Sequence, residues 1–218
     1  MADIQISDKT YFSQYISIDH FISYFHQLDI LTSLNCSSIL EIGIGNKIVS
    51  DFLTRAGYKI TSCDFDQRLA PDVVANIQKL PFKDSAFDAV AAFEVIEHVP
   101  FEEIEEVLAE LFRITNKHVI ISIPYQTLYL NGALRLSFGR WRKLLTGILQ
   151  IPYFWIKIKW NPQKRYYWEH LEHHWEMGRR GYPKRRIRKL LKKYFEIEKE
   201  FQAVLNPYHY FFVLKKHK

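Results

Sequence analysis

The stretch SILEIGIGNK, residues 38–47, ends a short apolar run with two glycines, Gly43 and Gly45. An apolar, helix-like segment, residues 47–57, follows immediately. A strand, a tight glycine turn and a helix in this order bring backbone N–H groups close to an anionic or nucleoside ligand. We therefore expect a binding site for such a ligand at the end of the first strand.

Strand-like and helix-like segments alternate along the chain up to residue 124. The expected strands are residues 38–42, 58–66, 72–77, 87–95 and 117–125, and the expected helices are residues 49–56 and 100–115. Such alternation is typical of an α/β fold in which helices cover both faces of a parallel sheet.

The C-terminal part shows a different pattern. A helix that starts with proline is expected over residues 183–196, and two β-rich runs, residues 197–205 and 208–216, follow it. The dipeptide Asn206-Pro207 between the two runs is a turn signal. We therefore expect an antiparallel hairpin at the edge of the sheet.

The whole chain, residues 1–218, is expected to form one domain, because 218 residues with 48% hydrophobic content suffice for one α/β core. The pattern adds an N-terminal helix at about residues 7–33 and an aromatic, basic insertion at about residues 125–180. The polar start and the lack of an apolar run of about 18–20 residues indicate no signal peptide and no membrane span. The two cysteines lack metal-ligand spacing. A cytoplasmic protein is therefore expected.

Two common nucleotide motifs fit the glycine turn poorly. A dinucleotide fingerprint would have a third glycine where this chain has Ile48, although Asp64 has the spacing of the acidic residue in that motif. A phosphate-binding P-loop is excluded because no Gly-Lys-Ser/Thr follows. The ligand must therefore be identified from the residues around the turn.

Those residues resemble a known family. Glu41 lies two residues before the first glycine, and Asp64 ends the second expected strand. The runs NIQKLPFKDSAFDAV, residues 76–90, and AFEVIEHVP, residues 92–100, follow. In combination they resemble the class I S-adenosylmethionine-dependent methyltransferases, specifically the type 11 methyltransferase family.

The resemblance continues into the C-terminal part. Residues 173–199 and 206–214 look like the corresponding part of one bacterial and archaeal branch of that family. The resemblance implies a Rossmann-like fold with a mostly parallel seven-stranded sheet, an antiparallel C-terminal hairpin and helices on both faces.

S-adenosylmethionine is the cofactor that the resemblance implies, with S-adenosylhomocysteine as the product. Gly43 and Gly45 would let the cofactor lie against the backbone. Glu41 would meet the positively charged end of the cofactor, directly or through water. Asp64 would accept hydrogen bonds from both ribose hydroxyls, as an ionised carboxylate can.

Six further residues complete the expected cofactor site. Asn76 and Ile77 would border the adenine, with an amide where many relatives have aspartate. Phe93 and Glu94 end the fourth expected strand and would lie beside the sulfonium and its methyl group. Core packing of Phe93 and a solvated position of Glu94 are the alternative interpretations. The remaining two residues are Asn46 and Phe65.

A hydroxyl acceptor would benefit from a general base, and histidine is the usual candidate. His173 and His174 lie in the run EHLEHHWEMG, residues 169–178, and His174 is the first candidate. A purely structural role is the alternative for both histidines. This run could also ligate a divalent metal, but no spacing of a known metalloenzyme appears, so no metal is expected.

Positive charge is concentrated in one part of the chain. Residues 125–193 contain 17 Lys and Arg against 3 Glu, in a protein of net charge +6. We expect residues 125–180 to cover the carboxyl ends of the strands, where ligands bind in open α/β sheets. Their side chains suit an anionic acceptor such as a phosphorylated or acidic sugar, an anionic membrane surface, RNA or an ordinary surface. Nucleic acid is disfavoured because no nucleic-acid motif is visible.

The leading hypothesis is an S-adenosylmethionine-dependent methyltransferase that acts at an oxygen of a small-molecule or glycan-type acceptor. The alternatives are an RNA methyltransferase and a non-catalytic, S-adenosylmethionine-binding or membrane-associated scaffold. The expected location is the cytoplasm, with a peripheral position at the inner membrane face as a variant of it. The sequence leaves the acceptor and the oligomeric state open.

Overall fold

The computed structural model describes residues 17–135, 150–158 and 173–217. Its centre is a seven-stranded sheet with the strand order β3-β2-β1-β4-β5-β9-β8. The direction of this order reverses between β1 and β4, and ligands of open α/β sheets bind at such a point. The strands are β1 (Ile39–Ile42), β2 (Ile60–Asp64), β3 (Val73–Val74), β4 (Phe87–Phe93), β5 (Thr115–Pro124), β8 (Phe195–Gln202) and β9 (His209–Lys216).

Strands β1 to β5 pair in parallel, whereas β9 is antiparallel to β5 and β8 is antiparallel to β9. The predicted Rossmann-like sheet with a C-terminal hairpin at its edge is therefore confirmed. Because β9 runs in the opposite direction, its first residue, His209, lies opposite Pro124, the last residue of β5. The start of β9 thus joins the carboxyl ends of the parallel strands.

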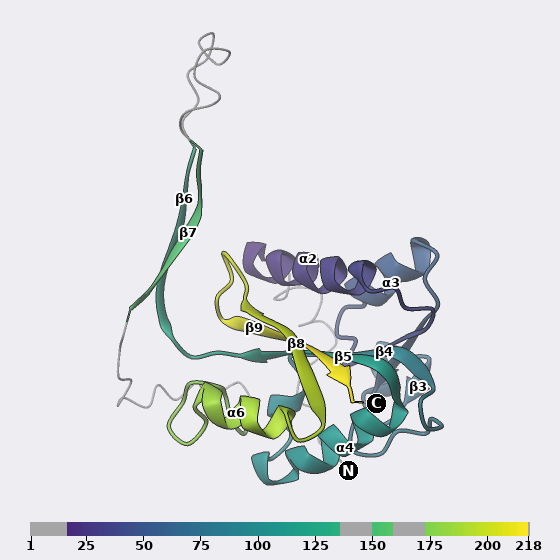
Figure 1. Ribbon diagram of the computed structural model, residues 1–218. Coiled ribbons are helices and arrows are strands. Elements are labelled where there is room, and N and C mark those ends of the chain that lie inside the picture. The colour runs from purple at the N-terminus through teal and green to yellow at the C-terminus, as the bar shows by residue number, and fades with distance from the viewer. Residues whose placement is uncertain (1–16, 136–149, 159–172, 218) are drawn as a thin grey trace.

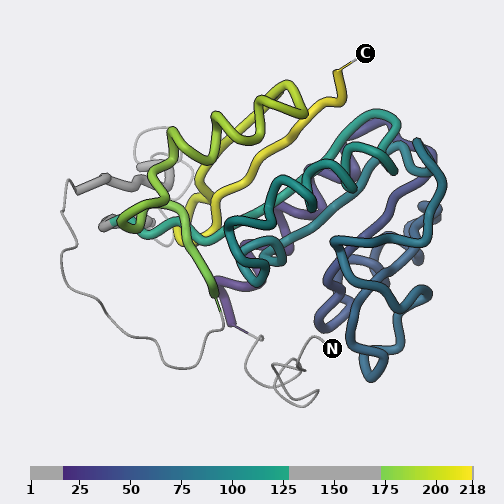
Figure 2. The backbone as a smooth tube through the Cα atoms, turned by 90° about the horizontal axis from the view of Figure 1, so that it is seen from below, coloured from purple at the N-terminus to yellow at the C-terminus, as the bar shows by residue number. Residues whose placement is uncertain are grey.

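Helices cover both faces of the sheet, as Figures 1 and 2 show. On one face lie α2 (Ile18–Ser33) and α3 (Ile48–Arg55), and on the other lie α4 (Ile104–Ile114) and α6 (Lys184–Leu191). Three short 3-10 helices connect the elements: η1 (Gln67–Leu69), η2 (Ile96–His98) and η3 (Phe101–Glu103).

The side chains of the central strands alternate between two hydrophobic clusters. In β5, Val119, Ile121 and Ile123 join the cluster that includes α4 and α6, whereas Ile120 joins the cluster that includes α2 and α3. All four side chains are inaccessible to solvent. Burial on both faces explains why the parallel strands appear in the sequence as nearly continuous apolar runs.

A second, two-stranded antiparallel sheet is formed by β6 (Leu128–Arg135) and β7 (Gln150–Ile158). It projects from the domain as a long ribbon (Figure 1). The backbones of these two strands pair with each other, and the expectation that the insertion covers the strand ends stays a prediction. Residues 136–149 and 159–172, which also belong to the insertion, lie outside the described residues.

Of two further predicted helices, one extends into residues outside the described ranges, and the other ends earlier than predicted. The helix expected over residues 7–33 is described only from Ile18, where the Ser17 side chain accepts a hydrogen bond from the backbone of His20. The helix α6 ends at Leu191, earlier than predicted, because Phe195 already belongs to β8. Within the described ranges, no helix is both long and apolar enough to cross a bilayer.

Candidate active site

The glycine turn after β1 requires glycine for two reasons. Gly43 and Gly45 have φ angles of +78° and +47°, in the left-handed region that side chains disfavour. A Cβ atom on Gly43 would also lie 2.3 Å from Cγ2 of Val95. The turn therefore brings the end of β1 and the segment after β4 into direct contact.

The carboxylate of Asp64 is anchored behind this turn. Its two oxygens accept hydrogen bonds from the backbone N–H groups of Ile44 and Asp66, each at 2.9 Å. Burial raises the pKa of Asp64, although these hydrogen bonds act in the opposite direction. A carboxylate oxygen has about two lone-pair sites, so each oxygen retains an acceptor position for a ribose hydroxyl.

Glu41 places a buried carboxyl group, with one oxygen unpaired among the described residues, at the same end of β1. The unpaired oxygen is Oε2. Burial raises the pKa of Glu41 to about 8, while hydrogen bonds to Ser50 act in the opposite direction. A buried carboxylate without a partner is unfavourable, so Glu41 fits the cationic end of the implied cofactor.

Asn46 and Lys47 point away from one another. The Asn46 side chain donates to the hydroxyl of Tyr24 on α2 at 2.8 Å, which ties α2 to the glycine turn. Lys47 has a φ of +62°, and its ammonium donates to the backbone carbonyl of Ala70. Tyr24 was not expected from the sequence, because a tyrosine on an amphipathic helix indicates only packing.

The adenine-side residues lie on adjoining segments at the ends of β2 and β3. The carbonyl of Asp64 accepts a hydrogen bond from the backbone N–H of Ala75, which directly precedes Asn76 and Ile77. Phe65 and Asn76 are exposed, whereas Ile77 is buried. The structure therefore brings together the residues that the sequence assigned to the ribose and the adenine.

Phe93 and Glu94 stand at the end of β4. Phe93 is buried, with its ring centroid 6.2 Å from that of Phe211. Glu94 has a φ of +53°, and its backbone N–H donates to the carbonyl of Ser122 at 3.1 Å. Burial raises the pKa of Glu94 to about 8; a hydrogen bond to Ser122 lowers it, and the charge of Glu176 raises it further.

Next to Glu94 lies a group that we call the carboxylate–histidine cluster. Its members are buried or partly buried near the carboxyl ends of β4 and β5, and they come from three separate parts of the chain. They are Glu94, Glu97, His98, His173, Glu176 and His209.

The two predicted base candidates occupy different environments. The His173 ring, on a side chain that is 10% exposed, lies with Nδ1 2.9 Å from Oε1 of Glu176 and Nε2 4.0 Å from Oε1 of Glu97. His174 is exposed, and its backbone N–H donates to the carbonyl of Glu97 at 2.9 Å. The cluster therefore contains the ring of His173 and not that of His174.

His209 is a member that the sequence analysis missed. Its Nδ1 atom lies 2.6 Å from Oγ of Ser23, and its Nε2 atom lies 3.6 Å from Oε2 of Glu94. Burial, reinforced by His20 and His173, lowers the pKa of His209 to about 3. At neutral pH His209 and Glu94 are therefore mainly a neutral pair rather than an ion pair. The run NPYHYFFVL contained this residue, but only the antiparallel register places it at the strand ends.

Comparison with known proteins identifies the domain. Residues 40–123 match the family model of a methyltransferase domain. This segment spans β1 to β5 except for the first residue of β1 and the last residue of β5, and it includes the glycine turn, Asp64 and Glu94. No curated protein matches the chain.

Solved structures share the whole fold. One of them is the magnesium protoporphyrin IX methyltransferase from Synechocystis PCC 6803 with bound S-adenosylhomocysteine. It is 18% identical to this chain and superposes with a TM-score of 0.59, and the match covers 99% of this chain and 90% of that chain. The 1,6-didemethyltoxoflavin-N1-methyltransferase from Burkholderia thailandensis is 12% identical at a TM-score of 0.60, with coverage of 96% and 85%.

The N-methyltransferase NodS from Bradyrhizobium japonicum WM9 is 10% identical at a TM-score of 0.57, with coverage of 100% of this chain and 94% of that chain. These likenesses concern the fold, which agrees with the family match. The family match thus identifies residues 40–123 as a methyltransferase domain, and the solved structures show that the chain has the fold of such enzymes.

Proposed function

We propose that the enzyme transfers the methyl group of S-adenosylmethionine to a hydroxyl group of a small-molecule acceptor, with glycan-type molecules as the first class to test. The observation that supports this proposal is the carboxylate of Glu94. It lies at the end of β4, its Oε1 atom has no hydrogen-bond partner among the described residues, and its pKa is raised to about 8.

Methyl transfer is a displacement at a carbon that the sulfonium already activates, so the protein mainly aligns the two reactants. In this proposal Asp64 holds the ribose, Glu41 holds the cationic end of the cofactor, and the glycine turn supplies a close backbone surface. The acceptor hydroxyl loses its proton as its oxygen attacks the methyl carbon.

We assign the proton acceptor to Glu94 rather than to a histidine. A general base works best when its pKa lies near the working pH, and a pKa of about 8 meets that condition. His209 is a weaker base because its pKa is lowered to about 3. The ring of His173 is already directed at Glu176 and Glu97, and His174 is exposed.

A methyl-transfer assay over acceptor classes tests the proposal. Purified enzyme and labelled S-adenosylmethionine would be incubated with neutral, phosphorylated and acidic sugars, other small alcohols, small amines and RNA. Transfer to a hydroxyl compound supports the proposal, whereas transfer only to amines or RNA contradicts it. Cofactor binding without transfer to any acceptor would support the scaffold alternative.

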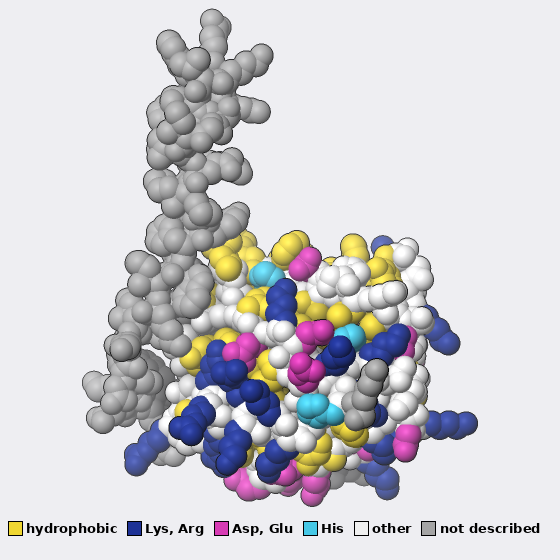
Figure 3. Space-filling model, viewed as in Figure 1, with side chains coloured by type: hydrophobic (Ala, Val, Ile, Leu, Met, Phe, Trp, Pro, Cys, Tyr) yellow, Lys and Arg dark blue, Asp and Glu magenta, His cyan; other side chains and the backbone are white. Residues whose placement is uncertain are grey.

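The exposed basic side of α6 favours a second proposal, namely contact with an anionic surface such as a membrane. Figure 3 shows dark blue side chains gathered over this part of the molecule. A shallow surface there is lined by Lys184, Arg185, Arg188, Lys189, Lys192 and Lys193. Basic segments of this kind are attracted to acidic lipid headgroups. Vesicle binding, described in the Discussion, tests this proposal.

A further inference from the structure

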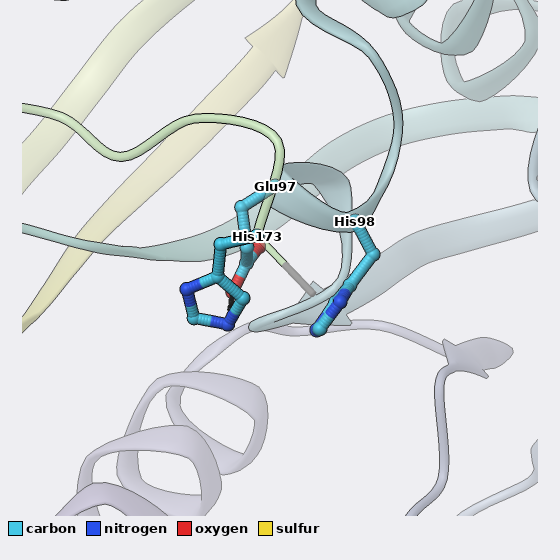
Figure 4. Close-up of side chains that lie close together, drawn as sticks. All are labelled: Glu97, His98 and His173. Carbon is cyan, nitrogen blue, oxygen red and sulfur yellow. Dashed lines mark ion pairs between the residues drawn. The ribbon is translucent and has the colours of Figure 1, made fainter. Parts of the chain in front are cut away.

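Three potential ligand atoms converge beside the predicted cofactor residues. Glu97 and His98 lie on η2, directly after β4, and His173 approaches them from a distant part of the chain (Figure 4). One carboxylate oxygen and one ring nitrogen from each histidine lie within 4.8 Å of one another. This arrangement is not explained by the methyl-transfer proposal.

Glu97 is the unusual member of this group. Its side chain is 0% exposed, and neither of its carboxylate oxygens has a hydrogen-bond partner among the described residues. The nearest opposite group is the His173 ring, whose Nε2 atom is 4.0 Å away from Oε1. A buried carboxylate in this situation is very unfavourable without a cation or a proton.

Glu176 contacts the ring of His173 at Nδ1, whereas Glu97 lies nearer to Nε2. The Nδ1 atom of His173 lies 2.9 Å from Oε1 of Glu176, and we assign the proton to Nδ1 from this contact, which leaves Nε2 as the ligand atom on the side of Glu97. Glu176 is in turn held by the Arg179 guanidinium at 2.7 Å and the Tyr208 hydroxyl at 3.2 Å. A metal-binding histidine usually donates a hydrogen bond from its other ring nitrogen to a carboxylate, and this bond fixes the tautomer and the orientation of the ring.

The backbone holds the two segments in fixed relation. The N–H of His174 donates to the carbonyl of Glu97 at 2.9 Å, and the Trp175 indole donates to the carbonyl of Val99 at 3.1 Å. The N–H of Met177 donates to the carbonyl of Pro124 at 3.1 Å. These backbone and indole hydrogen bonds therefore hold the two segments that carry Glu97, His98 and His173 close together.

We propose that Glu97, His98 and His173 bind a divalent transition-metal ion of the Zn²⁺ type. Two nitrogens and one oxygen suit such ions, whereas Ca²⁺ and Mg²⁺ prefer oxygen ligands alone. With metal–ligand distances of about 2.0–2.2 Å, two ligand atoms on one ion lie at most about 4.4 Å apart. The 4.0 Å between His173 and Glu97 already meets this limit, and because all three atoms lie within 4.8 Å of one another, no pair has to close by more than about half an ångström.

Metal titration of the full-length protein tests this inference without reference to any acceptor. The chelator-treated protein would be titrated with Zn²⁺ by calorimetry and with Co²⁺ by visible absorption. We expect one ion per chain in the wild type. Glu97→Gln and His173→Ala should weaken binding by more than about 100-fold, beyond the 10–100-fold effect that loss of an outer carboxylate typically has. Glu176→Gln should show that smaller effect.

The matched control is His174→Ala. This residue is the direct neighbour of His173, but its side chain is exposed and only its backbone contacts Glu97. Its replacement should leave Zn²⁺ affinity within about threefold of the wild type, well below 1.4 kcal/mol. Circular dichroism would verify that each variant is folded.

Thermal unfolding provides a second readout, because an ion that binds only the folded state raises the melting temperature. Zn²⁺ should therefore stabilise the wild type and His174→Ala, but not Glu97→Gln. Absence of saturable binding by the wild type would overturn the inference whatever the variants do. Equal losses in His174→Ala and His173→Ala would also overturn it. Since neither measurement uses methyl transfer, failure here leaves the proposed function intact.

Discussion

The two halves of the proposed ligand-binding edge are assembled in different ways. The cofactor half is local: Glu41, Gly43 and Asp64 come from two neighbouring strands and the turn between β1 and α3. The other half, the carboxylate–histidine cluster, combines the end of β4, the segment before α6 and the start of β9. Local sequence spacing describes the first half, whereas only the folded chain produces the second.

The two halves also differ in how their polar groups are satisfied. Asp64 accepts two backbone hydrogen bonds and needs only a ligand with hydroxyl donors. In the cluster, Glu94 and Glu97 together have three carboxylate oxygens without hydrogen-bond partners among the described residues. The cofactor half is thus a prepared receptor, and the cluster is a site whose charge is balanced only when protons, a cation or an acceptor are present.

The largest expected effect is a loss of turnover without a matching loss of cofactor affinity. Glu94→Gln keeps the size of the side chain but removes the base, so turnover should fall by about 100- to 10,000-fold. Cofactor affinity should change little, because the glycine turn and Asp64 are untouched. In the wild type, turnover should rise with pH as Glu94, whose pKa is raised to about 8, becomes ionised.

Steady-state kinetics and calorimetry on the same preparations measure both quantities. If Glu94→Gln retained more than about a fifth of the wild-type turnover, Glu94 would not be the base, since positioned bases contribute at least about 100-fold. A parallel loss of cofactor affinity would instead place Glu94 in the cofactor half.

The second prediction applies to the cofactor half alone. Asp64→Ala removes a charged acceptor from the ribose, and such hydrogen bonds contribute roughly 1.5–3 kcal/mol. Affinity for S-adenosylmethionine should therefore fall by about 10- to 100-fold in calorimetry. Asp66→Asn is the matched control, because the Asp66 carboxylate is paired with Arg68 at 2.7 Å. Equal effects of the two substitutions would contradict the assignment of Asp64 to the ribose.

The contrast between the halves explains how much the sequence could predict. Alternating apolar runs were enough for the strands from Ile39 to Pro124, because burial on both faces leaves a continuous signal. The hairpin of β8 and β9 followed from two β-rich runs around Asn206-Pro207. His209 was missed because its position at the strand ends depends on the register of β9 against β5.

Other members of the cluster were missed for related reasons. Glu97 appeared only within the run AFEVIEHVP, and nothing in its local sequence indicates complete burial. The sequence ranked His174 above His173 because His174 begins the run HWE in the motif that resembles the family. Only the backbone, which turns the His173 side chain inward and leaves that of His174 exposed, distinguishes these adjacent residues. The catalytic assignments of both histidines stay predictions.

The third prediction uses pH to examine Glu41. Because its pKa is raised to about 8 in the folded protein, the folded state binds this proton more tightly than the unfolded chain does. The resulting stabilisation is complete below the unfolded-state pKa of about 4.5 and is lost as pH rises toward about 8. The melting temperature of the ligand-free wild type should therefore decline over this range relative to that of Glu41→Gln.

Cofactor binding should show the opposite dependence, because the cationic ligand favours the ionised carboxylate. Below about pH 8, each added pH unit should strengthen binding to the wild type by up to about tenfold relative to Glu41→Gln. Calorimetry between about pH 6 and about pH 8.5 measures this difference. Parallel pH profiles for the two proteins would remove Glu41 from the cationic end of the cofactor.

The smallest expected effect concerns α6, which belongs to neither half. Lys189 is exposed on this helix and lines its basic surface. If α6 contacts acidic lipid, Lys189→Gln should weaken binding to phosphatidylserine vesicles about fivefold, since one basic residue near such a surface contributes about 1 kcal/mol. Binding by the wild type should also fall steeply with salt, because the Debye length shrinks to about 3 Å at 1 M. Vesicle co-sedimentation measures both effects, and Lys59→Gln, a change on the loop before β2, is the control for net charge.

Cofactor affinity and Zn²⁺ binding should be the same in both lysine variants, because neither lysine is part of the cofactor half or the cluster. Absence of vesicle binding at low salt would restrict the basic side of α6 to a role as solvated surface, whereas a change in cofactor affinity would mean that α6 is coupled to the binding edge after all.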